Sequence, residues 1–281
     1  MTKAKNETPD ILYHYTSVDT LLKIIENGQA EKVCFRATNI NFFNDPQEYT
    51  LAISLLKQSM IQYEKIKSIK NPKSKQANWK SISNLSNLSG TPFLLSLSLN
   101  PDNLAMWRNY GANGKGVAIG IEYDKIIKYT QAESVYNTSL VKCHYSKDII
   151  ISSLISYWES NYDEIDFTDK GKTVNFYNTN FLFDLSSLCF TIKNNEYSYE
   201  DEWRLCKNEY KAEEIKFREK NGIIVPFIEH FFEKGIIKEI VVGPCVNKDL
   251  TKKSIEFLLK KRKFQIPEDS IVLSKVQYRT F

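Results

Sequence analysis

Three polar residues, His14, Tyr15 and Thr16, stand at the end of a strand predicted over residues 11–15, directly before a predicted helix. A buried polar group without a partner costs roughly 1 to 3 kcal/mol, so a fold tolerates such groups mainly where they have a task. The end of a strand directs side chains toward a crevice rather than toward the core. His14 is therefore a candidate for substrate contact, and a satisfied core or surface histidine is the alternative.

A dense group of charges, Glu200-Asp201-Glu202-Trp203-Arg204, lies in a later predicted strand. The two-residue period of a strand places Glu200, Glu202 and Arg204 on one face. Two carboxylates about 7 Å apart along a strand can divide the work, with one ionised and one tuned by its neighbours. Arg204 can pair with Glu202, and an exposed, charged edge strand is the alternative.

Aromatic and amide residues add two further candidate groups. Trp107 and Tyr110 are three positions apart in a predicted helix, so they share a face and could stack on a planar ligand. Core packing of the two rings is the alternative. Residues 44–48, which include Asn44, either contribute to the site or form a helix N-terminus capped by Asp45.

Arginine is scarce in this chain, with six arginines against thirty-two lysines. Three of the six, Arg36, Arg108 and Arg204, fall inside or beside the groups above. The planar guanidinium binds phosphate through two hydrogen bonds at once. The distribution of arginine therefore favours a ligand that carries phosphate.

Hydrophobic periodicity predicts strands interleaved with helices of unequal length, and no glycine-rich phosphate loop follows the first strand. We expect a single α+β domain over 11–281 whose mixed, mainly antiparallel sheet is split around a crevice and flanked by helices. A disordered tail over 1–10 and a basic, partly flexible insertion at about 67–90 complete the prediction. Strands are expected at 11–15, 32–36, 91–100, 116–123, 141–146, 198–207, 223–227, 237–244 and 270–281. Helices are expected at 18–28, with Ser17 as its N-cap, and at 46–66, 102–110, 148–162, 173–193 and 248–263.

The composition, 42% hydrophobic and 26% charged over 281 residues, is typical of a globular protein. No apolar run reaches the ~18 to 20 residues of a membrane span, and the N-terminus lacks a secretory signal, so we expect a cytoplasmic protein. Five scattered cysteines without a C-x-x-C pair argue against a disulfide framework and a zinc site. The net charge of +4 is too small to indicate a nucleic-acid binder. The seven lysines from Lys57 to Lys80 form either a solvated connector or a nucleic-acid contact.

The candidate groups follow one another in a specific order: HYTS, NDPxE, SLSxNxxxxxMWxxYG with GVAIGI, ExEWR, and a terminal VVGP-helix-strand. Together they resemble a bacterial family of domains of unknown function, from about Ile11 to Thr280. One position departs from the expected pattern, because Arg36-Ala37-Thr38 stands where a serine is expected after the second strand. The family description carries no activity.

A second resemblance is to ADP-ribosyltransferases of the DarT-like and diphtheria-toxin kind, which combine a strand-end histidine, an aromatic partner for a planar ring and a late glutamate in an E-x-E strand. It implies that Glu202 stabilises the oxocarbenium-like transition state formed when NAD loses nicotinamide. It implies that Glu200 orients the acceptor or acts as a base toward it, and that His14 holds a ribose hydroxyl. The nicotinamide would stack on Trp107 or Tyr110.

The same resemblance implies further residues around NAD, with Arg36 or Arg108 on the pyrophosphate. NAD would be a substrate, the acceptor a protein or a nucleic acid, and no metal would be bound. The physiological role would be that of a bacterial toxin or phage-defence effector with a neutralising partner. The residues expected near NAD are Tyr15, Thr16, Arg36, Asn44, Trp107, Arg108, Tyr110 and Arg204.

Two other classes of protein stay open. A divalent-metal nuclease would gather Asp45, Glu48, Glu200 and Glu202 around the ion, with Lys207 nearby. A non-catalytic module for nucleotide or nucleic acid would use the same crevice without turnover. Loss of activity in EDTA favours the nuclease, and NAD-dependent turnover that survives EDTA favours the transferase.

Overall fold

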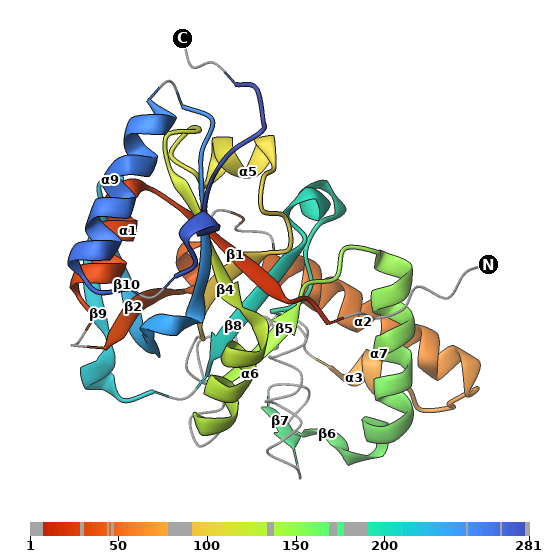
Figure 1. Ribbon diagram of the computed structural model, residues 1–281. Helices are drawn as coiled ribbons and strands as arrows, with labels where there is room; N and C mark the ends of the chain where they lie inside the picture. Colours follow the sequence, from red (N-terminus) through yellow and green to blue (C-terminus); the bar gives the residue numbers. More distant parts are fainter. Residues whose placement is uncertain are drawn as a thin grey trace. The chain divides into compact units, whose positions relative to one another are not determined.

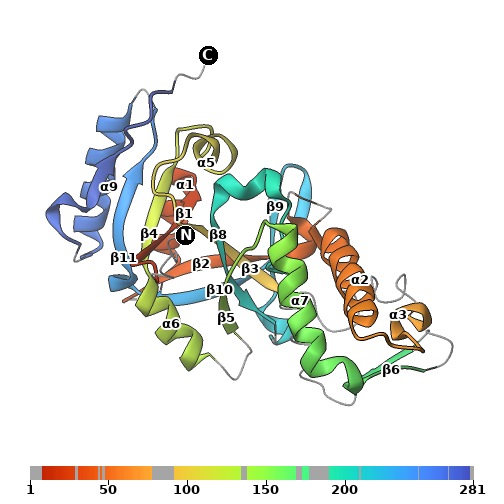
Figure 2. The same cartoon turned by 90° about the vertical axis from the view of Figure 1, so that its right-hand side faces the viewer.

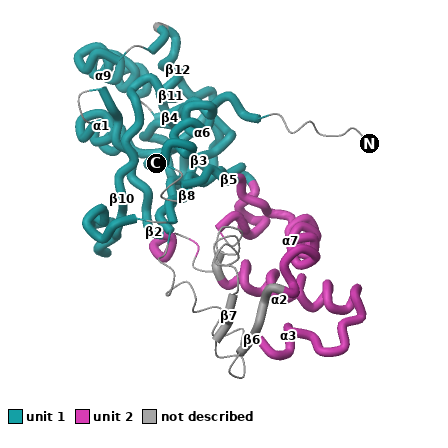
Figure 3. Tube along the Cα trace, turned by 90° about the horizontal axis from the view of Figure 1, so that it is seen from below, with its two compact units in different colours: residues 1–39, 92–141, 199–281 teal, residues 40–91, 142–198 magenta. Residues whose placement is uncertain are grey.

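The chain divides into two compact units in the computed structural model (Figure 3). Unit 1 comprises residues 1–39, 92–141 and 199–281, and unit 2 comprises 40–91 and 142–198, where the sequence led us to expect one domain. Of the predicted tail and insertion, residues 1–7 and 78–91 lie outside the described residues. The structure describes residues 8–28, 31–43, 45, 48–77, 92–133, 138–168, 173–176, 190–208, 210–245, 247–264 and 266–278.

Unit 1 is built on a ten-stranded sheet. Its strands are drawn as arrows in Figure 1, where several of them are labelled. The strands are β1 (Ile11–Thr16), β2 (Lys32–Asn39), β3 (Phe93–Ser98), β4 (Val117–Glu122), β5 (Thr138–Lys142), β8 (Glu202–Lys207), β9 (Lys216–Lys220), β10 (Ile223–Glu233), β11 (Ile237–Val242) and β12 (Ile271–Leu273). Their order is β12-β11-β4-β1-β3-β2-β10-β9, and β8 pairs with both β3 and β5. β11 and β12 run parallel, whereas β1, β3, β4, β8 and β10 pair antiparallel with their neighbours. The predicted α+β class with a mainly antiparallel sheet is therefore confirmed.

One face of this sheet carries the main hydrophobic core. Apolar side chains from β1, β2, β3, β8 and β10 pack there against α1 (Val18–Glu26), α6 (Tyr123–Ala132) and α9 (Lys248–Lys261). Helix α1 begins as predicted, because the Ser17 hydroxyl accepts a hydrogen bond from the Thr20 amide at 3.1 Å. The helices thus cover the face on which Leu12, Phe35 and Leu205 lie, each at most 1% exposed.

The opposite face of the sheet carries the polar residues. Tyr13 pairs with Ser98, and Ser98 pairs with Glu202, so these three side chains share a face. Ser96 and Arg204, one step of two residues further along their strands, lie on it as well. This polar face is covered in part by α5 (Leu104–Asn109).

β1 and β2 both pair with β3, but at different ends of that strand. β1 is in register with β3 at Tyr13 and Ser98, whereas β2 is in register with it at Thr38–Leu94 and at the adjacent pair. β8 pairs with β3 along its whole length, so β1 and β2 share the other edge of β3. The middle of β3 therefore lies where its two neighbours on that side diverge.

Unit 2 has a core of its own between α2 (Glu48–Ile66) and α7 (Lys147–Asn161), which lie side by side in Figures 2 and 3. The Trp158 indole of α7 donates to Ser59 of α2 at 2.9 Å. A buried carboxylate, Glu64, accepts hydrogen bonds from the Ser74 amide at 2.8 Å and from the Tyr162 hydroxyl at 2.6 Å. The unit also contains α3 (Lys73–Gln76), the 3-10 helices η1 (Ile40–Phe42) and η4 (Tyr162–Glu164), and the paired strands β6 (Ile165–Thr168) and β7 (Thr173–Phe176).

Several predicted elements are wrong in part, among them the strand expected over 270–281, which ends at Leu273. The helix expected over 173–193 begins as strand β7, and residues 190–193 form a turn and an isolated bridge, because an aromatic-rich run fits strand and helix equally well. The loop expected from residue 37 starts later, since Thr38 and Asn39 still pair with β3. The strand expected over 141–146 ends at Lys142. Across the described ranges, no helix is long and apolar enough to cross a membrane.

Candidate active site

Strand β3 brings together segments that are far apart in the sequence. Ser98 is in register with Tyr13 of β1 on one side and with Glu202 of β8 on the other, and Ser96 is in register with Arg204. The Ser98 hydroxyl also donates to the backbone carbonyl of Glu200 at 2.6 Å. The HYT segment and the ExEWR segment thus lie on either side of one strand, β3, within unit 1.

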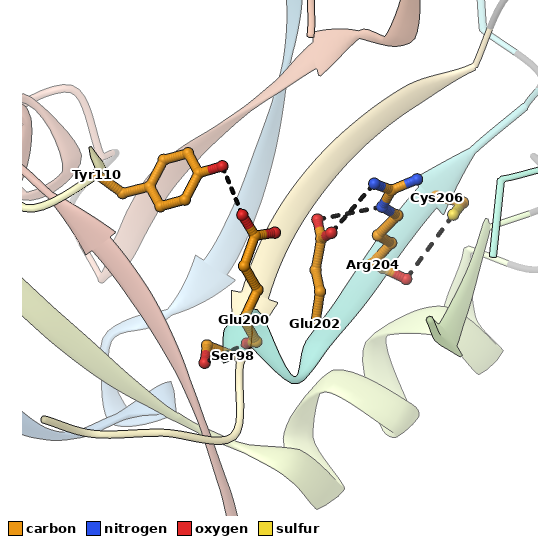
Figure 4. Close-up of polar contacts among 6 residues, drawn as sticks. All are labelled: Ser98, Tyr110, Glu200, Glu202, Arg204 and Cys206. Carbon is orange, nitrogen blue, oxygen red and sulfur yellow. Dashed lines mark hydrogen bonds and ion pairs between the residues drawn. The ribbon is translucent and has the colours of Figure 1, made fainter. Parts of the chain in front are cut away.

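The residues just before β8 are not a strand, which corrects the strand predicted from residue 198. Asn195–Glu200 form a 3-10 helix, η5, and Asp201 has a φ of +40° in the left-handed region. Aspartate tolerates this region better than most residues. The Asp201 carbonyl accepts from the Leu99 amide at 3.1 Å, and its carboxylate accepts from the Asn100 side chain at 3.2 Å. The two carboxylates that flank this turn nevertheless point to the same side of the chain (Figure 4).

Glu202 and Arg204 form a buried, bidentate ion pair. Nε of Arg204 donates to one carboxylate oxygen at 3.1 Å, and Nη2 donates to the other at 3.0 Å (Figure 4). Glu202 is 4% exposed and Arg204 is fully buried. Two parallel charge-assisted hydrogen bonds fix the orientation of the carboxylate and compensate its charge. The pairing that the sequence suggested for these two residues is present in the structure.

The second carboxylate, Glu200, is held by an aromatic hydroxyl. Tyr110 donates to its Oε1 at 2.8 Å, and Glu200 is 2% exposed. Tyr110 is the C-terminal cap of α5 and is itself half-buried. The motif thus presents two adjacent carboxylates in different surroundings, one on a guanidinium and one on a phenol.

Trp107 lies in the core rather than beside an open space. It is fully buried, its indole donates to Asp102 at 2.7 Å, and Tyr15 packs edge-on against it with ring centroids 4.7 Å apart. The Tyr15 hydroxyl donates to the carbonyl of Asn100 at 2.8 Å, and burial raises its pKa. Core packing, the alternative that the sequence left open for Trp107 and Tyr110, therefore accounts for Trp107, and Tyr110 is half-buried.

His14 bridges the strands where β1 and β2 diverge. Its Nδ1 donates to the carbonyl of Ser96 at 3.0 Å, and its ring packs edge-on against Phe35 of β2 at 5.8 Å. Burial lowers the pKa of His14, and the positive charge of Arg218 lowers it further, while the bond to Ser96 opposes the shift. A neutral ring that donates through Nδ1 keeps a lone pair on Nε2. No residue within the described ranges is hydrogen-bonded to that nitrogen.

The remaining predicted site residues are placed differently from one another. Thr16 ends β1 and is buried. Arg36 lies on the polar face of β2, 25% exposed. Arg108 is exposed and faces the C-terminal segment, with its Nε 3.5 Å from the Tyr278 hydroxyl, so it is not brought to Arg36. Asn44 lies outside the described residues.

Sequence reasoning missed Arg218. It stands on β9, a strand that was not predicted because its five residues, KFREK, are mostly charged. Its Nη2 donates to Thr38 at 2.7 Å, and its guanidinium carbon lies 5.6 Å from the centre of the Phe227 ring. The alternation of Lys216, Arg218 and Lys220 is the signal that could have revealed a strand with one basic face.

No group of three histidine, cysteine or acidic side chains within the described ranges could hold a metal ion. The side chain of Glu48, one of the ligands expected of a nuclease, lies outside those ranges. Cys34, Cys143 and Cys206 are buried free thiols and Cys245 is a half-buried one. Burial raises the pKa of the Cys206 thiol to about 12, so it is a packing residue rather than a nucleophile.

The fold and the site define an α+β protein in which two buried carboxylates and a histidine of β1 lie beside one strand, β3. Residues 106–205 match the model of a family described as "Protein of unknown function (DUF2971)". This span contains Tyr110, Glu200, Glu202 and Arg204, and it confirms the resemblance to a family of domains of unknown function over that part of the chain. No curated protein and no solved structure gives a match.

Proposed function

We propose that unit 1 carries an NAD-dependent glycosyl-transfer site of the ADP-ribosyltransferase type. The observation that carries this proposal is the pair of buried carboxylates, Glu200 and Glu202, that Tyr110 and Arg204 hold beside β3. His14, which shares the face of Leu12, contacts the same strand through the Ser96 carbonyl. A strand-end histidine and an E-x-E pair are also the features that the sequence shares with such enzymes. A toxin or phage-defence role with a neutralising partner belongs to the same proposal.

Glu202 suits the role of the carboxylate that stabilises the transition state. Cleavage of the bond between ribose and nicotinamide develops positive charge on the ribose, and a fixed negative charge stabilises it. Arg204 holds the Glu202 carboxylate in one orientation, so little reorganisation is needed during the reaction. Glu200 would orient the acceptor or take its proton.

His14 and Tyr110 suit the binding of the two halves of the nicotinamide riboside. The lowered pKa of His14 keeps its ring neutral near pH 7, and Nε2 can then accept a hydrogen bond from a ribose hydroxyl. The half-buried ring of Tyr110 would stack on the nicotinamide, because Trp107 has no exposed surface. Arg36 would contact the phosphates.

Access to the carboxylates requires a movement. Glu200 and Glu202 are 2% and 4% exposed, so a substrate touches them only after a covering group has moved. Tyr110 is hydrogen-bonded to Glu200 and is half-buried. We expect this ring to leave the Glu200 carboxylate when the nicotinamide binds.

The test is the release of nicotinamide from NAD by the purified full chain, measured by liquid chromatography with cell extract as a source of acceptor. Removal of one electrostatic stabiliser typically lowers turnover by about 10² to 10³, so Glu202→Gln should reduce release by that factor. The matched control is Glu64→Gln, which removes a carboxylate that is 5% exposed and lies in unit 2. It should keep wild-type turnover.

The alternatives give different outcomes in the same experiment. Release that survives EDTA supports the transferase, and nucleic-acid cleavage that EDTA abolishes supports the nuclease. A thermal shift with NAD that is lost in His14→Ala, without nicotinamide release, supports a binding module. The absence of both the thermal shift and nicotinamide release would reject the proposed function.

A further inference from the structure

Two arginines flank one aromatic ring on the polar face of unit 1. Arg36 of β2 and Arg218 of β9 lie on either side of β10, whose Phe227 stands between them in the sheet order. The guanidinium carbons are 4.6 Å and 5.6 Å from the centre of the Phe227 ring. A guanidinium stacked on a ring keeps the edge with its N–H groups available for another partner.

The positive charge around these arginines is only partly compensated. Lys216 and Lys220 lie on the same strand as Arg218, two residues to either side of it. In the described ion pairs the negative charge comes from Glu229. Its carboxylate oxygens lie 2.6 Å from Nζ of Lys216 and 3.7 Å from Nε of Arg36. Glu229 is therefore the one carboxylate that the described ion pairs give to these four cations, and it contacts two of them.

Arg218 has a buried donor that lacks an acceptor among the described residues. Its Nη2 donates to Thr38, but its Nε is buried and has no hydrogen-bond partner within the described structure. Burial lowers the pKa of Arg218 and the charge of Arg36 lowers it further. Burial also lowers the pKa of Lys220, and the charge of Arg218 adds to that shift. Because a guanidinium does not lose its proton near neutral pH, this repulsion persists until an anion binds.

We propose that Arg36 and Arg218 form a binding site for a diphosphate group. Two planar guanidiniums can each hold a phosphate through paired hydrogen bonds, and the buried Nε of Arg218 would gain its missing acceptor. Arg218 also acts electrostatically on His14, which links this site to the candidate active site. As the seat of the NAD diphosphate the site rests on the proposed function, but binding of a diphosphate as such does not require NAD cleavage.

The test is isothermal titration of the full chain with inorganic pyrophosphate, ADP and adenosine. We expect pyrophosphate and ADP to bind, adenosine to bind far more weakly, and the affinity for pyrophosphate to fall as salt rises. Arg218→Gln should weaken pyrophosphate binding roughly ten- to hundredfold. Arg262→Gln is the matched control, because it removes an exposed arginine of unit 1 whose partner is Glu26.

The variants separate binding from folding. Arg218→Gln relieves repulsion, so it should melt no lower than the wild type, and Arg36→Gln should weaken binding as well. Arg218→Lys keeps the charge but loses the fork of donors, so partial weakening is expected. If either glutamine variant fails to fold, the other provides the measurement.

Two results would overturn the inference: wild-type protein that does not bind pyrophosphate, or equal weakening by Arg218→Gln and Arg262→Gln. Pyrophosphate binding that depends on Arg218, without any nicotinamide release, keeps the inference and rejects the proposed function. Nicotinamide release whose KM for NAD is unchanged in Arg218→Gln supports the proposed function and rejects the diphosphate site. Tighter binding of ADP than of pyrophosphate identifies a nucleotide as the ligand, and equal binding identifies the free diphosphate.

Discussion

Replacement of Glu202 by glutamine should cost stability as well as activity. Arg204 is fully buried, and its Nε and Nη2 both donate to the Glu202 carboxylate. Glutamine has nearly the same shape but carries no charge and one acceptor oxygen in place of two. The variant therefore removes the negative charge that is paired with this buried guanidinium.

The size of the effect follows from the burial of the pair. Removal of one partner of a buried ion pair costs about 3 to 5 kcal/mol, whereas an exposed pair contributes about 0 to 1 kcal/mol. Lys23 and Asp19 provide the exposed comparison, because their side chains are 52% and 68% exposed at a distance of 2.6 Å. We expect Glu202→Gln to lower the free energy of unfolding by about 3 kcal/mol and Asp19→Asn by less than 1 kcal/mol.

The assay is urea unfolding followed by far-ultraviolet circular dichroism at neutral pH. The double variant Glu202→Gln/Arg204→Met removes both charges, so it should be more stable than Glu202→Gln alone. Glu202→Gln that loses no more stability than Asp19→Asn would refute the reasoning. So would a double variant whose loss is the sum of the two single losses, since the residues would then not be coupled.

Two titrations follow from the buried histidines. Burial, assisted by Lys207, lowers the pKa of His230 from 6.5 to about 3, so the neutral ring stabilises the fold fully above pH 6.5 and this stabilisation is lost as the pH falls toward 3. Between pH 7 and pH 5, urea unfolding of the wild type should lose about 2 kcal/mol more than that of His230→Gln, and equal losses would contradict the burial of this ring. The pKa of His14, followed by NMR of its ring protons, should rise in Arg218→Gln because a nearby positive charge is removed. An unchanged pKa would show that Arg218 does not act electrostatically on His14.

Local patterns in the sequence predicted much of the secondary structure. The serine at position 17 and the apolar spacing after it predicted α1, and the apolar segments around Leu95 and Ile119 predicted β3 and β4. These signals succeed because a cap and a hydrophobic stripe act within a few residues of chain. The helix expected from Thr173 is wrong over Thr173–Phe176, because these residues also suit a strand and find a partner in β6. Residues 177–189 of that prediction lie outside the described residues.

The pairing of Glu202 with Arg204 was also readable from the sequence, because residues two apart on a strand share a face whatever surrounds them. The position of Glu200 was not, since it depends on the turn at Asp201, which is held by Leu99 and Asn100 from another part of the chain. Alternation alone could not say which face of each strand would meet the core.

The sequence by itself determined which residue types were available for chemistry and which of them were neighbours along one strand or helix. Only the tertiary structure decided that Trp107 is buried, that His14 meets Ser96 where β1 and β2 diverge, and that Arg218 reaches Phe227 beside Arg36. Each of these depends on the register of strands that are distant in the chain. Register is set by the burial of whole strand faces, which no short stretch of sequence encodes.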